Sequence, residues 1–89
     1  MGDMAEDFRA LREHLREQRA ARRETRVPEV LALRGDGRQV REMNGTYQLR
    51  IDGAIDLYPT NRRYHHLKTG KRGRYHSPRE IVDRLLPRR

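Results

Sequence analysis

Three observations predict an α+β domain: a long run of helix-forming residues at the N-terminus, glycine turns between strand-like segments, and a capped helix near the C-terminus. We therefore expect an N-terminal helix, a three- to four-stranded antiparallel sheet and a C-terminal helix. With 89 residues, the chain has room for one compact domain at residues 35–89, preceded by an N-terminal helical segment at residues 1–34. Only 34% of the residues are hydrophobic and 38% are charged, so the core must be small.

The first predicted helix covers residues 4–26, which contain neither Gly nor Pro and are rich in Ala, Leu, Arg, Glu and Gln. An apolar stripe recurs there at i, i+3 and i+7: Phe8, Leu11 and Leu15. This stripe either docks on the chain's own sheet, or forms a homodimer or binds another protein. Because the stripe ends at Leu15, we expect the second half of the helix to project into solvent or against a partner. Pro28 suits the first position of a second short helix that ends at Gly35.

A change to two-residue periodicity after residue 40 predicts strands. Asn44-Gly45 and Asp52-Gly53 separate strand-like runs, which favours a three-stranded meander, and residues 63–68 could add a fourth strand. A two-residue turn at Asp52-Gly53 would place Ile55 on the face opposite to Ile51. Either this turn carries a bulge or the central strand is covered on both faces.

The C-terminal helix has the clearest local signals. Ser77, Pro78 and Glu80 provide an N-cap, a proline at the first helical position and the third-position glutamate of a capping box. Apolar residues at helical spacing follow, and Pro87 ends the helix. We expect this helix to pack on the sheet.

The formal net charge of +8 is concentrated in residues 57–79, which contain seven basic residues and no acidic residue. Such a patch, interleaved with Tyr and His, favours binding of a polyanion, above all DNA or RNA through its phosphates. Stacking of Tyr64 and Tyr75 on unpaired bases would add to phosphate contacts. The sequence therefore predicts a non-enzymatic nucleic-acid-binding protein of low sequence specificity. The predicted contact residues are Arg62, Arg63, Tyr64, His65, Lys68, Lys71, Arg72, Arg74 and Tyr75.

The sequence predicts neither a metal site nor a cofactor. There is no cysteine, and the adjacent His65 and His66 would point to opposite faces of a strand. Phosphate-binding, dinucleotide-binding and serine-nucleophile motifs are also absent. Asp52 and Asp56 could approach each other across a hairpin, as magnesium-binding carboxylates of nucleases do, but each also has an ordinary structural role there. We expect no catalytic residue.

The alternative function is that of an inhibitor or adaptor that binds a host protein, through the basic face or the N-terminal helix. No apolar run approaches the length of a membrane span, and no signal-peptide segment begins the chain. We therefore expect a cytoplasmic protein with no membrane partner.

The run from residue 55 to residue 65, together with residues 68–73, resembles small, uncharacterised bacteriophage proteins. The same layout resembles the zinc-ribbon domain of bacterial-type primases, in which a strand, a proline turn, a Tyr-His strand, a glycine-bracketed basic loop and a helix follow in order. That resemblance implies contact with single-stranded DNA and a phage-type protein acting in the host cytoplasm. It covers about a third of the chain, and every zinc-ligating cysteine of the primase domain is missing. The matching positions are Tyr64, His65, Lys71, Arg72 and Gly73.

Overall fold

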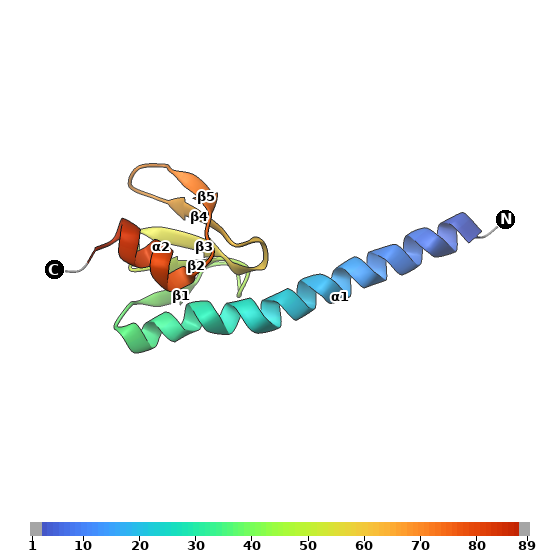
Figure 1. Ribbon diagram of the computed structural model, residues 1–89, viewed down its shortest axis with the longest axis horizontal. Coiled ribbons are helices and arrows are strands. Elements are labelled where there is room, and N and C mark those ends of the chain that lie inside the picture. Colours follow the sequence, from blue (N-terminus) through green and yellow to red (C-terminus); the bar gives the residue numbers. More distant parts are fainter. Residues whose placement is uncertain (1–2, 88–89) are drawn as a thin grey trace.

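The α+β class is confirmed, with five strands where three to four were predicted. The computed structural model describes residues 3–87, with side chains described from residue 8 onward. A long helix leads into an antiparallel meander, and a short helix closes the chain (Figure 1). The elements are α1 (Asp3–Leu31), a 3-10 turn (Ala32–Asp36), β1 (Val40–Glu42), β2 (Leu49–Ile51), β3 (Ile55–Tyr58), a second 3-10 turn (Pro59–Asn61), β4 (Arg63–His66), β5 (Arg72–Arg74) and α2 (Pro78–Leu85).

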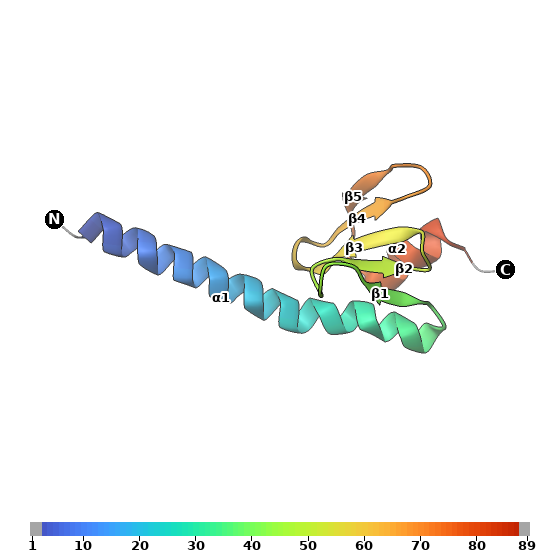
Figure 2. The same cartoon turned by 180° about the vertical axis from the view of Figure 1, so that it is seen from behind.

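The strands lie in chain order, β1-β2-β3-β4-β5, and every neighbouring pair is antiparallel. The helix α2 covers one face of this sheet, and the C-terminal part of α1 runs along the β1 side of the same layer (Figures 1 and 2). Between the helices and the sheet lies a small core. It contains Val27, Val30, Leu33, Leu49, Ile51, Ile55, Leu57, Ile81 and Val82.

The β2–β3 turn contains a bulge, which was one of the two alternatives that the sequence allowed. Ile51 and Ile55 are direct cross-strand partners, so three residues and not two form the turn. Asp52 and Gly53 both have left-handed φ angles, of 52° and 68°, and the Ala54 N–H donates to the Ile51 carbonyl at 2.9 Å. The extra residue returns β3 in phase with β2, and the apolar residues of both strands therefore face the same core.

The prediction that a new helix begins at Pro28 is wrong, because α1 continues through this proline to Leu31. Proline removes one backbone donor from a helix interior, yet burial of Val27 and Val30 on either side holds the helical path. The helical segment then tightens into the 3-10 turn and ends at Gly37, whose φ of 81° requires the freedom of glycine. Gly35, the predicted end, lies inside that turn.

The prediction for the second half of the first helix is right for residues 16–22, which are exposed, but the helix continues beyond residue 26 and docks there. The C-terminal part of α1 docks on the domain through Val27 and Val30, and the first half projects away from it (Figure 1). Phe8, Leu11 and Leu15 remain 59%, 52% and 43% exposed, so docking of the apolar stripe on the chain's own sheet is excluded.

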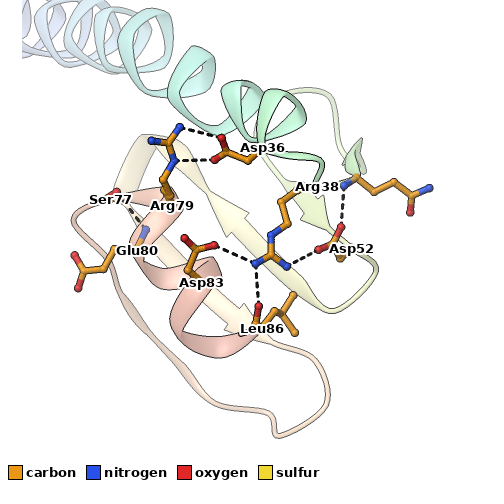
Figure 3. A network of polar contacts seen from close by, with 9 residues as sticks. Asp36, Arg38, Asp52, Ser77, Arg79, Glu80, Asp83 and Leu86 are labelled. Carbon is orange, nitrogen blue, oxygen red and sulfur yellow. Dashed lines mark hydrogen bonds and ion pairs between the residues drawn. The ribbon is translucent and has the colours of Figure 1, made fainter. Parts of the chain in front are cut away.

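The predicted cap of α2 is confirmed, and an ion-pair network fastens this helix to the rest of the domain (Figure 3). The Glu80 N–H donates to the Ser77 hydroxyl at 3.3 Å. The buried Arg38 guanidinium donates to Asp52 at 2.9 Å and Asp83 at 3.0 Å. It also donates to the carbonyl of Leu86, at 2.8 Å, and thereby joins the segment before β1, the β2–β3 turn and the end of α2.

Candidate nucleic-acid interface

Strand alternation divides the sheet into two chemically different faces. On the face toward the helices, the cross-strand partners Leu49, Leu57 and Tyr64 are all buried. The residues between them point the other way, and we call that side the outer face of the sheet. Across the five strands its first row is Arg41, Arg50, Asp56, His65 and Arg72. Its second row is Tyr58, Arg63 and Arg74.

Neither helix covers the outer face, which is turned toward the viewer in Figure 2. Arg41, Arg63, Arg72 and Arg74 are exposed, and none of them has an ion-pair partner among the side chains described in residues 8–87. Arg63 and Arg74 are direct cross-strand partners. Like charges placed opposite each other destabilise a sheet, so this arrangement carries a cost that an anion would remove.

Asp56, the one carboxylate in these two rows, is already neutralised. It is 2% exposed and accepts two hydrogen bonds from Arg50, at 2.8 and 3.1 Å, and one from Gln48 at 2.8 Å. Burial alone would raise the pKa of Asp56, but these hydrogen bonds and the Arg50 charge outweigh it and hold the pKa below its usual range. The remaining arginines of the outer face therefore present their charge uncompensated.

A groove of about 540 Å³ crosses one end of the outer face, and we call it the outer groove. Arg63, Arg72 and Arg74 line it together with Tyr58 and His65. Gly73 forms part of the wall. A Cβ at this position would lie 2.9–3.1 Å from atoms of the Tyr64 side chain. The missing side chain lets that ring lie directly against β5.

The predicted contact residues separate into three groups in the structure: one at the outer groove, one in the β4–β5 turn, and a partly or fully buried group of Arg62, Tyr64 and Tyr75. Arg63, Arg72 and Arg74 come together with the half-buried His65 at the outer groove. Lys68 and Lys71 are exposed in the β4–β5 turn, at the other end of β4. This turn and the Arg62-Arg63 pair therefore lie at opposite ends of β4. Arg72 and Gly73, which the primase resemblance places in a glycine-bracketed loop, belong to strand β5.

The predicted stacking role of Tyr64 and Tyr75 is wrong, because both rings belong to the core at 5% and 7% exposure. Burial raises the pKa of Tyr75.

Arg62 is half-buried, has a left-handed φ of 51°, and keeps a buried Nε without a hydrogen-bond partner in residues 8–87.

Sequence reasoning missed Arg41 and Tyr58, although a signal was present. Arg41 follows the buried Val40, and Tyr58 follows the buried Leu57, so strand alternation turns both side chains away from the core. The side of Tyr58 follows only once the bulge after Ile51 is known, because this bulge sets the phase of β3 relative to β2.

The carboxylates and histidines do not converge on a chemical site. Asp52 binds Arg38 and the Gln39 N–H, whereas Asp56 binds Arg50, so the two carboxylates have separate partners. His65 lies on the outer face, and His66 lies on the core side with Nδ1 3.0 Å from the Thr69 hydroxyl. Within the described residues, no group of three or more His, Cys, Asp or Glu could hold a metal ion.

No family model, curated protein or solved structure matches this chain. The resemblance to phage proteins and to the primase zinc ribbon stays a prediction. Among residues 3–87, no helix is both long enough and apolar enough to cross a membrane.

Proposed function

We propose that this chain binds nucleic acid through the outer face of its sheet, with low sequence specificity and without catalysis. The observation that carries the proposal is the pair of cross-strand arginine rows, in which the one carboxylate is neutralised by Arg50. Guanidinium groups donate planar pairs of hydrogen bonds that match phosphate oxygens. Because phosphates are the same in every sequence, contacts of this kind position a nucleic acid without reading it.

The sheet geometry supports an anionic ligand in a second way. Arg63 faces Arg74 across neighbouring strands, and neither has an ion-pair partner among the side chains described in residues 8–87. A polyanion bound over this pair would relieve its mutual repulsion and release counterions. Lys68 and Lys71 would extend the contact along the β4–β5 turn. We propose a cytoplasmic location, which would be the host cytoplasm if a phage encodes the protein.

Fluorescence anisotropy with labelled DNA and RNA oligomers at low salt tests the proposal. We expect the wild type to bind. In a plot of log affinity against log salt concentration for duplex DNA, the double variant Arg63→Gln/Arg74→Gln should have a slope smaller in magnitude by about 1.8, at roughly 0.9 per lost phosphate contact. The double variant Arg22→Gln/Arg84→Gln is the matched control, since it removes the same charge from exposed positions outside the outer face. Wild-type protein that binds none of the oligomers at low salt would overturn the proposal.

The alternative, binding of a host protein as an inhibitor or adaptor, is favoured by the exposed apolar stripe of α1. Phe8, Leu11 and Leu15 lie on the projecting half of this helix, where they contact nothing in the core. A pull-down from nuclease-treated host lysate would support it if the wild type recovers one protein in stoichiometric amount. The variant Leu11→Ser should lose this partner, and Arg63→Gln/Arg74→Gln should still recover it. Sedimentation analysis of the purified chain would separate this outcome from a homodimer.

A further inference from the structure

The helix α1 carries a second row of arginines on the side that faces the domain. Arg12, Arg16, Arg19 and Arg23 are spaced i, i+4, i+7 and i+11, which places them on one helical face. The same spacing continues to Val27 and Val30, which are buried in the core. The row therefore points toward the space beside the domain where α1 leaves it.

This row lines a second groove, of about 760 Å³, which we call the helix groove. Its opposite wall includes Tyr47, Thr60 and Asn61. Asn61 also lines the outer groove, so the two grooves adjoin at the 3-10 turn Pro59–Asn61. In Figure 2 this turn lies at the corner where the projecting half of α1 diverges from the end of the sheet.

The inner end of the row is held in place, and the rest is free to bind. The Arg23 guanidinium lies 4.1 Å from the centre of the Tyr47 ring and donates to the Tyr47 and Thr46 hydroxyls at 2.9 Å each. Arg12, Arg16 and Arg19 are exposed and have no ion pair among the side chains described in residues 8–87.

From this arrangement we infer that the ligand is double-stranded nucleic acid, held in the corner with the outer face as one wall and the α1 arginines as the other. The inference rests on the proposed function, and it adds the ligand class and a second binding surface. From Arg12 to Arg23 the row extends about 17 Å at 1.5 Å per residue. Over that length a duplex presents about ten phosphates, since its charges recur every 1.7 Å or so along the axis.

The aromatic residues argue against a single strand as the preferred ligand. Binding of unpaired strands without sequence preference relies on open rings on which bases stack. Here Tyr64 and Tyr75 are buried, and Arg23 occupies one face of the Tyr47 ring, which is 55% exposed. Tyr58 is half-buried and is the one tyrosine left on the outer face. A rigid duplex can contact the outer face and the α1 arginines at the same time, and the surface therefore favours it over a flexible single strand.

The test compares a labelled duplex of about 20 base pairs with its two separate strands, over a range of salt concentrations. We expect wild-type protein to bind the duplex more tightly than either strand. The double variant Arg12→Gln/Arg16→Gln should reduce the magnitude of the duplex salt slope by about 1.8. The control Arg22→Gln/Arg84→Gln should keep the slope within about 0.5 of the wild-type value. Circular dichroism controls for helix content, which Gln preserves because its helix propensity is close to that of Arg.

Equal or tighter binding of a single strand would overturn the inference, and so would an unchanged salt slope in Arg12→Gln/Arg16→Gln. Both outcomes leave the proposed function in place as long as the wild type binds and Arg63→Gln/Arg74→Gln weakens that binding. Wild-type protein that binds neither duplex nor strands would overturn the proposed function itself.

Discussion

The two faces of the sheet use the same strands for opposite purposes. On the core face, Leu49, Ile51, Ile55 and Leu57 have no exposed surface. On the outer face, β2 and β3 contribute Arg50 and Asp56, which pair with each other. The flanking strands β1, β4 and β5 contribute arginines that lack ion-pair partners within residues 8–87. Because neighbouring side chains on a strand point to opposite sides, stability and binding can be encoded in alternate positions with little interference. Substitutions on the two faces should therefore separate these properties.

The largest loss of stability is expected for Leu57→Ala on the core face. Leu57 is fully buried in β3 at the centre of the sheet, and truncation of such a leucine costs about 2–5 kcal/mol through lost burial and the cavity left behind. Urea denaturation followed by circular dichroism would measure the change. A loss below about 1 kcal/mol would contradict the assignment of this side chain to the core.

A smaller loss is expected for Gly73→Ala, where β5 lies against the Tyr64 ring. The added Cβ would lie 2.9 Å from the nearest ring atom, and overpacking of this kind costs about 1–3 kcal/mol. Gly35→Ala is the matched control, because a Cβ there meets no atom within 4 Å. Equal stability of the two variants in urea denaturation would show that the ring does not pack against β5.

Asp56 is the exception to the division between the faces, because it belongs to the outer face and is buried. Its pKa is lower in the folded protein than in the unfolded chain, so its contribution to stability is present above the unfolded value of about 3.9. That contribution is lost as the pH falls through the folded pKa. Urea denaturation between about pH 3 and pH 7 should show that the free energy of unfolding falls less on acidification for Asp56→Asn than for wild type. Identical pH profiles would disprove the role of the Arg50 pair.

The smallest effect, of opposite sign, is expected for Arg74→Gln on the outer face. Removal of the charge opposite Arg63 should raise the free energy of unfolding by about 0.2–1 kcal/mol at low ionic strength. The gain should shrink as salt is added, because salt screens exposed charges. Nucleic-acid affinity should fall in the same variant. A variant that loses both stability and affinity would contradict the separation of the two faces.

Local signals predicted the elements well, and tertiary packing decided the rest. The N-cap at Ser77 and the turn at Asp52-Gly53 involve residues close in sequence, so sequence alone identified them. Pro28 shows the limit of such signals, since burial of its neighbours overrides its local preference. The short strand β5 has no apolar pattern, and its pairing with β4 places it in the sheet.

The candidate site was predictable in its charge but not in its geometry. The excess of basic residues in 57–79 pointed to Arg63, Arg72 and Arg74, which do share one groove. Nothing local distinguishes a tyrosine that stacks on a base from one that packs in a core, so Tyr64 and Tyr75 were misassigned. The arginines of α1 were also overlooked, because nearby glutamates cancel their charge in any count along the chain.

The helix α1 is attached to the domain at one end only, and this has a consequence for amide hydrogen exchange. All described side chains from residue 8 to residue 22 are exposed, and a helical segment of this length is marginally stable in water on its own. Its amides should exchange much faster than those of β3, whose opening requires disruption of the core. A duplex bound in the helix groove would slow exchange at residues 12–19 and leave β3 unaffected. The rate at which these amides take up deuterium would then report directly on occupancy of the groove.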